Sequence, residues 1–279
     1  MNTLLQSELP GLVGGLHNFS TETHTAPQLV LSASTASGEF VLARLTDYIY
    51  GQLATNVAGN QFLQRSFAVA TAADHLSLQN QRQLGKLRER AHFCVHLTSS
   101  DSAIERVPQV QLGDASDDER ASACLFGLSA VLETGKRPVE PSFKMDGDWY
   151  GEQFRIELGR PSVLNLEYCN RVFGGLVHFL TRACFINLAK APDADEDLHY
   201  FGPKDYNVQE SSFDGLFASN KAPGDWVTSG QHIGYIYDSA SGAMLDEVTA
   251  EYDGLITGLR REPAIAAGNI ILELCCREK

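Results

Sequence analysis

The sequence predicts an α/β domain with a mixed sheet flanked by helices, followed by a small all-β barrel-sandwich domain. Through residue 190, short apolar runs typical of buried strands alternate with stretches whose apolar residues recur at helical spacing. After residue 197, short apolar runs are separated at close intervals by glycine-containing turns, which indicates strands without helices. Residues 191–197 combine a proline with four acidic side chains and no apolar side chain larger than alanine. We therefore expect two domains, residues 1–197 and 198–279.

The predicted front domain begins with a strand, a tight loop and a helix. Residues 28–33 form a short apolar run of the kind found in buried strands, and a loop of small residues follows at 34–38. From Glu39 to Leu53, apolar residues fall close to helical spacing, so an amphipathic helix is expected there. This order is typical of the start of an α/β domain.

Further strands and helices continue this alternation. The runs Arg65 to Ala70, His92 to Thr98 and Pro161 to Glu167 indicate three more strands. The segments Ala121 to Leu132 and Val172 to Leu188 indicate two more helices. Strands and helices are therefore expected to alternate up to residue 190.

The charge of the chain disfavours some partners. Its 279 residues carry a formal net charge of −13, so nucleic acids and anionic membrane surfaces would repel it at long range. The longest apolar run, Val172 to Ala191, includes His178, Arg182 and Lys190 and is a poor candidate for a membrane span. We therefore expect a protein that binds neither nucleic acid nor membrane.

Cysteine usage and the first residues indicate the compartment. The six cysteines are scattered without a C-x-x-C pair, so neither a zinc knuckle nor a disulfide framework is expected. The first residues include Glu8 and Pro10 and lack the basic start and apolar run of a secretory signal. A reduced, cytoplasmic compartment is the expectation.

Three phrases in the tail resemble a known family. They are Ser212 to Phe217, Gly224 to Gly234 and Glu247 to Ile256, in which Asp-Gly or Ser-Gly pairs supply tight turns between short alternating strands. Together they are similar to the tail domain of the succinylglutamate desuccinylase/aspartoacylase family of zinc deacylases. Biotinyl and lipoyl carrier domains share the pattern, but the matching tip, Asp238 to Met244, has no lysine to modify. A carrier role is therefore not expected.

The resemblance implies a front domain like that of zinc carboxypeptidases. In the family, a His and a Glu from an H-x-x-E loop and a second His from a D-x-H strand hold the metal. The metal polarises an amide carbonyl while a nearby carboxylate activates water. On this sequence Glu39 falls on the ligand glutamate, whereas Ala36 occupies the first His position. The methyl group of Ala36 cannot bind zinc.

The second strand that the resemblance implies is also altered. In His92 to Thr98, Val95 stands in place of the family's Asp and Leu97 in place of the second His, while His96 lies one residue earlier. Because successive side chains of a strand point to opposite faces, His96 is expected to point away from the metal site unless a bulge shifts the register. Glu39 and His96 are therefore the candidate metal ligands.

The remaining candidates concern catalysis and substrate binding. The segment Gly159 to Glu167 resembles the family strand that ends in the catalytic glutamate, which assigns the role of general base and acid to Glu167. The family's N-R pair for a substrate carboxylate falls near Asn80 and Arg82, although Gln81 separates them here.

The altered ligand positions decide the expected function. Two of the three implied metal ligands are absent, so we expect a non-catalytic protein without a cofactor that binds a small carboxylate-bearing molecule or a partner. One alternative is an active hydrolase of N-acyl amino acids, with zinc held by Glu39 and His96 and with Glu167 as base. A second is an assembly role, such as a homo-oligomer, in which the tail docks on another chain. Arg106 and Arg171 are further candidates for holding a carboxylate, against the commoner role of arginine on a solvated face.

Overall fold

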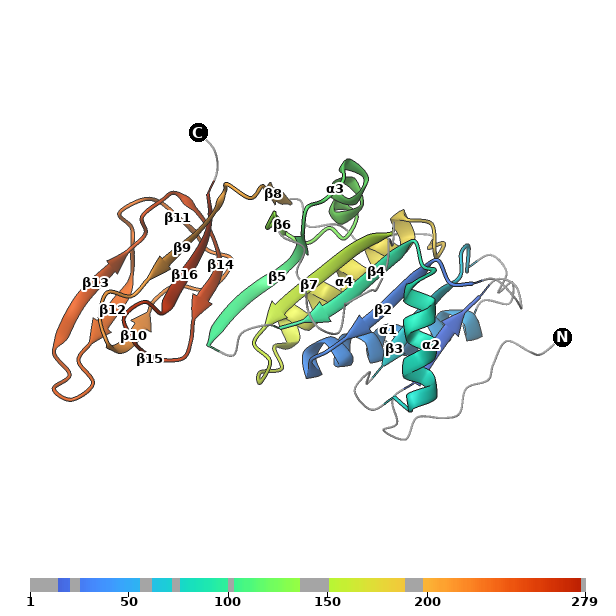
Figure 1. Ribbon diagram of the computed structural model, residues 1–279, viewed down its shortest axis with the longest axis horizontal. Coiled ribbons are helices and arrows are strands. Elements are labelled where there is room, and N and C mark those ends of the chain that lie inside the picture. The colour runs from blue at the N-terminus through green and yellow to red at the C-terminus, as the bar shows by residue number, and fades with distance from the viewer. Residues whose placement is uncertain are drawn as a thin grey trace.

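The computed structural model describes residues 15–20, 26–55, 62–71, 76–99, 103–135, 151–188 and 198–276. Figure 1 shows a sheet flanked by helices and, beside it, a part made of strands alone that holds the last strands of the chain. The elements are, in chain order, β1 (Gly15–Phe19), β2 (Leu29–Ala33), α1 (Ala36–Thr55), β3 (Phe67–Thr71), α2 (Leu78–Arg88), β4 (Phe93–Thr98), β5 (Ile104–Leu112), α3 (Asp117–Cys124), β6 (Ala130–Glu133), β7 (Glu152–Gly159), α4 (Leu166–Arg182), β8 (His199–Phe201), β9 (Tyr206–Glu210), β10 (Gly215–Ser219), β11 (Trp226–Val227), β12 (His232–Tyr237), β13 (Met244–Thr249), β14 (Gly254–Arg260), β15 (Ala264–Ile265) and β16 (Ile270–Cys276).

One large sheet runs through the molecule. Its strands lie in the order β1-β3-β2-β4-β7-β5-β14-β16-β9, and β6, β8 and β11 pair beside this path. β3, β2, β4 and β7 are parallel neighbours, whereas β1 and β5 pair antiparallel with β3 and β7. All residues of β2 and β4 are buried, as expected for parallel strands covered on both faces. The predicted mixed sheet with flanking helices is confirmed.

Helices pack on both faces of this sheet (Figure 1). α1 and α4 pack against each other on one face, where apolar side chains of β2, β4, β5 and β7 complete the largest core. The rings of Phe126 and Phe179 stack there with centroids 4.2 Å apart, and Phe154 contacts both. α2 lies on the other face, over β1 and β2, where Leu84 joins a smaller core.

Several predicted elements of the front domain are present. β2, β3 and β4 confirm the strands expected at 28–33, 65–70 and 92–98, and α1 contains the helix expected at 39–53. The helix expected at 172–188 exists as α4, although it begins and ends six residues earlier. Among the described residues, no helix combines the length and the apolar composition that crossing a bilayer would need.

The helix expected over residues 121–132 is wrong in its second half. α3 ends at Cys124, Gly127 adopts a φ of +62°, and Ala130–Glu133 forms a strand, β6. Glycine adopts this left-handed conformation without steric cost and commonly terminates helices. The glycine therefore separates a short helix from a strand within one apolar stretch.

The strand expected over residues 161–167 is wrong as well. The strand is β7, which ends at Gly159 with a φ of +61°, and α4 follows after a short loop. Asn165 caps that helix, because its side-chain oxygen accepts hydrogen bonds from the backbone N–H groups of Glu167 and Tyr168 at 3.1 and 3.2 Å. Glu167 therefore lies in the first turn of a helix.

The tail forms the predicted all-β part. β10, β12, β13 and β15 make a four-stranded sheet, while β14, β16 and β9 continue the large sheet. Buried aliphatic residues of both sheets, among them Ile233, Ile256 and Leu272, form a core of their own. Gly230 adopts a φ of +81° in the turn before β12, as its Ser-Gly turn signal predicts. The linker predicted at 191–197 lies outside the described residues.

Strand pairing joins the tail to the front sheet. β14 pairs antiparallel with β5 and places Gly258 opposite Arg106. β8, which follows residue 197, pairs with β6 of the front part. The large sheet is therefore continuous from the front part into the tail. The division into residues 1–197 and 198–279 stays a prediction.

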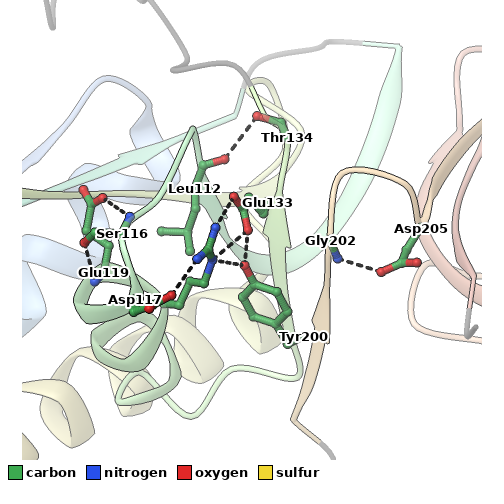
Figure 2. A network of polar contacts seen from close by, with 10 residues as sticks. Leu112, Ser116, Asp117, Glu119, Glu133, Thr134, Tyr200, Gly202 and Asp205 are labelled. Carbon is green, nitrogen blue, oxygen red and sulfur yellow. Dashed lines mark hydrogen bonds and ion pairs between the residues drawn. The ribbon is translucent and has the colours of Figure 1, made fainter.

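A polar network fastens β8 to α3 and β6 (Figure 2). The guanidinium of Arg120 in α3 donates to both carboxylate oxygens of Glu133, at 3.0 and 2.9 Å, and the Tyr200 hydroxyl donates to the same carboxylate. The hydrogen bonds from Arg120 lower the pKa of Glu133 to about 2. Burial and the hydrogen bond to Glu133 raise the pKa of Tyr200 to about 12. The network therefore ties the start of the tail to the edge of the front sheet.

Candidate functional site

β4 presents different residues to the two faces of the sheet. Phe93, Val95 and Leu97 point into the core under α1 and α4, whereas the side chains that alternate with them, Cys94, His96 and Thr98, point to the α2 side. The pairings of β4 with β2 and with β7 run without a register shift. Within these described strands, no bulge turns His96 toward α1.

Leu97 fills the position at which the resemblance implies a metal-binding histidine. Its side chain is fully buried, and the first turn of α1 packs directly on it. A Cβ atom at Gly38 would lie 2.9 Å from Cβ of Leu97 and 3.0 Å from Cβ of Ala33, so this close approach requires glycine. Ala36, at the other implied histidine position, begins α1 and is exposed. Neither side chain can donate an electron pair to a metal.

The two predicted metal ligands lie on opposite faces of the sheet. Glu39 is half-buried in the first turn of α1, whereas His96 is buried on the α2 side of β4. Zinc sites need three or four nitrogen, sulfur or oxygen ligands around one point. In the parts of the chain that the structure describes, no group of three or more His, Cys, Asp or Glu side chains could hold a metal ion. These residues therefore do not fit the zinc site that the resemblance implies.

The other predicted site residues also lie apart. Glu167 is exposed in the first turn of α4, where a carboxylate interacts favourably with the helix dipole. Asn80 lies in the first turn of α2 and donates its backbone N–H to the Ser77 hydroxyl, and Arg82 is exposed on the same helix. α4 and α2 pack on opposite faces of the sheet, so the structure does not bring Glu167 together with Asn80 and Arg82.

A buried polar cluster lies on the α2 side of the sheet, and we define it as Ser32, Arg88, His96, Arg155 and Glu157. The Ser32 hydroxyl lies 3.0 Å from Nδ1 of His96 and accepts a hydrogen bond from Nη2 of Arg88 at 2.8 Å. Nη2 of Arg155 donates to the Glu157 carboxylate at 2.5 Å. Ser32, His96 and Glu157 are each at most 3% exposed. These three side chains are therefore almost out of contact with water, whereas Arg88 and Arg155 are half-buried.

Three neighbouring strands and one helix place the polar cluster. β2, β4 and β7 are parallel, and their register puts Ser32, His96 and Arg155 side by side in a row across the sheet. Glu157 lies two residues further along β7, and Arg88 reaches the row from the last turn of α2. Open α/β sheets commonly bind ligands outside the carboxyl ends of their strands. The polar cluster lies toward that end of these three strands.

His96 is neutral in this environment. Burial lowers its pKa to about 3, and the positive charges of Arg88 and Arg155 act in the same direction. Its Nδ1 lies 3.0 Å from the Ser32 hydroxyl, and its Nε2 lies 3.0 Å from the Ser34 hydroxyl. A neutral imidazole has one donor and one acceptor nitrogen, so the two serines can satisfy both. The ring is therefore held in one orientation.

β5 adds Gln109 beside the polar cluster. Gln109 is the antiparallel partner of Glu157 and is 1% exposed. Its Oε1 atom has no hydrogen-bond partner among the residues that the structure describes. Buried acceptors without a donor are uncommon in folded proteins. Gln109 therefore places an unsatisfied buried acceptor beside the polar cluster.

The charges of the polar cluster favour an anionic ligand. The polar cluster contains two guanidinium groups, those of Arg88 and Arg155, and one carboxylate, that of Glu157, while His96 is neutral. Guanidinium groups bind carboxylates through two parallel, charge-assisted hydrogen bonds. A carboxylate would therefore complement the excess positive charge of the cluster.

Arg88, Arg155 and Glu157 are not among the candidates that the sequence alone suggests. A signal for two of them is present in β7, where polar and apolar residues alternate from Gln153 to Leu158. Such alternation is typical of a strand with one polar face. No comparable pattern marks Arg88, because only the packing of α2 brings it to β2.

Comparison with known proteins relates the chain to one group of structures. No family profile matches the sequence, and no curated protein matches it. Solved structures do match. A succinylglutamate desuccinylase/aspartoacylase from Shewanella frigidimarina has a TM-score of 0.71 at 11% identity, over 94% of this chain and 92% of that chain. A protein of that family from Shewanella amazonensis has a TM-score of 0.68 at 10% identity, over 93% of each chain. The ectoine utilization protein EutE (DoeB) from Ruegeria pomeroyi has a TM-score of 0.66 at 15% identity, over 94% of this chain and 89% of that chain.

These similarities confirm the fold that the tail phrases predict. The chain has the fold of the succinylglutamate desuccinylase/aspartoacylase proteins over almost its whole length. Proteins that share a fold at such low identity can differ in chemistry, because activity depends on particular residues of the site. The function must therefore be argued from the polar cluster and from the positions that zinc would need.

Proposed function

We propose that the chain is a non-catalytic protein with a deacylase fold, and that it binds a small carboxylate-bearing molecule at the polar cluster. The observation that carries the proposal is the row of Ser32, His96 and Arg155 across three parallel strands, with Arg88 bound to Ser32. This row brings hydroxyl, imidazole and guanidinium groups together, and Ser32 and His96 lie in the carboxyl-terminal halves of β2 and β4. Ligands of α/β sheets commonly bind at such ends.

The chemistry of the row supports a carboxylate. Two guanidinium groups flank the neutral His96, and each can donate charge-assisted hydrogen bonds to a carboxylate. Several similar solved structures carry the name succinylglutamate desuccinylase, which refers to a molecule with several carboxylates. A dicarboxylate such as succinate is therefore the first ligand to test.

The residues at the implied metal positions support a non-catalytic role. Ala36 and Leu97 offer no electron pair to a metal, which leaves Glu39 alone of the three implied ligands. Even losses outside the ligand shell cost zinc sites about 10–100-fold in affinity. The alternative hydrolase would need Glu39 and His96 to meet at one metal, although they lie on opposite faces of the sheet.

Isothermal titration calorimetry of the full chain with succinate tests the binding. We expect a dissociation constant below about 1 mM for the wild type. Arg88→Gln should bind about tenfold more weakly, because it removes a charged donor of the cluster. Arg90→Gln is the matched control, since Arg90 is exposed just beyond the same helix, and it should leave the affinity unchanged. No binding of succinate, or equal binding by Arg88→Gln, would overturn the proposed site.

Metal analysis and a hydrolysis assay test the non-catalytic part. We expect the purified protein to carry no stoichiometric zinc. We also expect N-succinylglutamate to stay intact when zinc, manganese or cobalt is added. Stoichiometric zinc together with hydrolysis that Glu167→Gln abolishes would establish the rewired hydrolase instead, because a neutral amide cannot act as the base.

A further inference from the structure

A series of side-chain hydrogen bonds, called here the hydrogen-bond chain, runs from α2 through the polar cluster to the end of β4. Nη2 of Arg88 donates to the Ser32 hydroxyl at 2.8 Å, and this hydroxyl lies 3.0 Å from Nδ1 of His96. On the other side of the ring, Nε2 of His96 lies 3.0 Å from the Ser34 hydroxyl, which donates to Oγ1 of Thr98 at 3.1 Å. The imidazole therefore connects a guanidinium group at one end to a threonine hydroxyl at the other.

The direction of these hydrogen bonds determines which nitrogen of His96 carries the proton. A neutral imidazole has one N–H donor and one acceptor nitrogen, and a serine hydroxyl has a single proton. The proton of Ser34 is used for the bond to Thr98. Ser34 therefore accepts a hydrogen bond from Nε2–H of His96, and Nδ1 accepts one from the Ser32 hydroxyl.

The opposite tautomer would leave two groups of the hydrogen-bond chain unsatisfied. With the proton on Nδ1, Ser32 would accept from both Arg88 and His96, and its own proton would have no acceptor among the residues that the structure describes. Ser34 would have no proton to offer Nε2. Leaving buried polar groups unsatisfied is destabilising, and the positive charge of Arg88 on the Nδ1 side also favours a lone pair there. His96 is therefore the Nε2–H tautomer.

This tautomer gives every donor of the hydrogen-bond chain the same direction, from Arg88 toward Thr98. Hydrogen bonds in series polarise one another, so each donor strengthens the next. Because Thr98 accepts from Ser34, its own O–H points away from Ser34. Thr98 is the last residue of β4, and Ser34 beside it is half-buried, so the hydrogen-bond chain approaches solvent at this end. Ligands of open α/β sheets commonly bind there.

We propose that His96 is a positioning residue of the polar cluster: as the Nε2–H tautomer, it orients the hydroxyls of Ser34 and Thr98 so that Thr98 donates a hydrogen bond to the carboxylate ligand. The contact between Thr98 and the ligand rests on the proposed function, whereas the tautomer of His96 does not. A carboxylate group only accepts hydrogen bonds, so a hydrogen-bond chain that ends in a donor matches an anion.

Nitrogen-15 NMR of the histidine side chains in the whole protein tests the tautomer without any substitution. At about pH 8, above the ordinary pKa of histidine, we expect His96 to carry its proton on Nε2. His178 is the internal reference, because its Nδ1 lies 2.7 Å from the carbonyl oxygen of Leu125, which can only accept. A proton on Nδ1 of both histidines would reverse the hydrogen-bond chain and overturn the proposal.

Calorimetry with succinate tests the contact with Thr98. Thr98→Val removes the hydroxyl at nearly constant shape and should weaken binding about tenfold, whereas Thr98→Ser keeps a hydroxyl and should restore most of the affinity. Succinate should also shift the Nε2 resonance of His96 in the wild type but not in Thr98→Val. The matched control is Thr46→Val: Thr46 is buried too, but it donates to the carbonyl oxygen of Leu42 within α1, and its loss should leave the affinity unchanged.

The two measurements fail separately. If His96 carries its proton on Nε2 but the wild type binds no succinate, the tautomer is upheld and the proposed function fails. If the wild type and Thr98→Val bind succinate equally well, Thr98 does not contact the ligand, and the positioning role of His96 is overturned.

Discussion

His96 and Leu97 are neighbours in β4 but belong to different environments. Leu97 lies in the apolar core and packs against Gly38 of α1. His96 contacts two serine hydroxyls, and the positive charges of two arginines lower its pKa. Packed volume determines stability on the first face, and the pairing of charges determines it on the second. A displacement of one residue along the strand thus separates a core leucine from a member of a charge network.

Removing a guanidinium from the charged face should have the largest effect. Arg155→Ala takes a donor from the Glu157 carboxylate, which is 1% exposed, and breaking a buried ion pair typically costs about 3–5 kcal/mol. Urea unfolding followed by circular dichroism measures the change in the free energy of unfolding.

A double variant sharpens this prediction. Arg155→Leu/Glu157→Leu removes both charges together, so its stability should lie much closer to that of the wild type than to that of Arg155→Ala. If Arg155→Ala lowers the free energy of unfolding by less than about 1 kcal/mol, the pair of Arg155 and Glu157 behaves as a solvent-exposed ion pair. The charged face would then not depend on the pairing of buried charges.

Removing volume from the apolar face should cost somewhat less. Leu97→Ala leaves a cavity at a fully buried position, and such changes cost about 2–5 kcal/mol. Leu97→Met keeps the volume and should cost less than about 1.5 kcal/mol. Equal unfolding midpoints for both variants in urea would contradict a tightly packed contact between Leu97 and α1.

Acid should weaken the charged face through His96. Its pKa is about 3 in the folded protein against 6.5 in the unfolded chain. Below pH 6.5 the unfolded chain therefore takes up a proton that the folded protein does not, and stability falls as the pH drops toward 3. Between pH 7 and 5 this contribution is about 2 kcal/mol. Urea unfolding at both pH values should show that the wild type loses about that much more than His96→Gln. The same loss in both proteins would mean that His96 is accessible to protons when folded.

Two glycines of α1 provide the smallest and most direct test of the apolar face. Gly38→Ala adds a methyl group 2.9 Å from Leu97, and the strain should exceed the gain in helix propensity by about 1 kcal/mol. A Cβ at Gly51 meets nothing within 4 Å, so Gly51→Ala should stabilise the protein by about 0.5–1 kcal/mol. Thermal unfolding should show that the two substitutions shift the melting temperature in opposite directions. Shifts in the same direction would show that the first turn of α1 moves to accommodate the added methyl group.

Local patterns predict much of the fold. Apolar runs specify β2, β3 and β4, and Asp-Gly and Ser-Gly turns specify the tail, because backbone preferences and burial act over a few residues. The period of two in a strand also predicts that His96 points away from α1, and the structure has it there.

The polar cluster depends on contacts between distant segments, which the sequence does not display. Arg88 binds Ser32, which lies 56 residues earlier in the sequence. Glu157 is buried because its strand, β7, pairs with β4 on one side and with β5 on the other. The family resemblance predicts that Glu167 ends a strand, but the Gly159 turn and the Asn165 cap convert that stretch into a loop and a helix. Such local conformations outweigh the apolar composition of the segment.

The pairing of β5 with β14 also bears on the behaviour of fragments of this protein. Around Ile104 to Arg106, β5 is an interior strand because β14 completes its hydrogen bonds on one side. Proteolytic loss of the tail would expose the backbone groups of this segment as an open sheet edge and would deprive Arg106 of Glu273, the carboxylate with which it forms an ion pair. Open edges of this kind recruit strands from other molecules. A front fragment released by cleavage is therefore expected to aggregate, and the tail protects the front sheet from self-association.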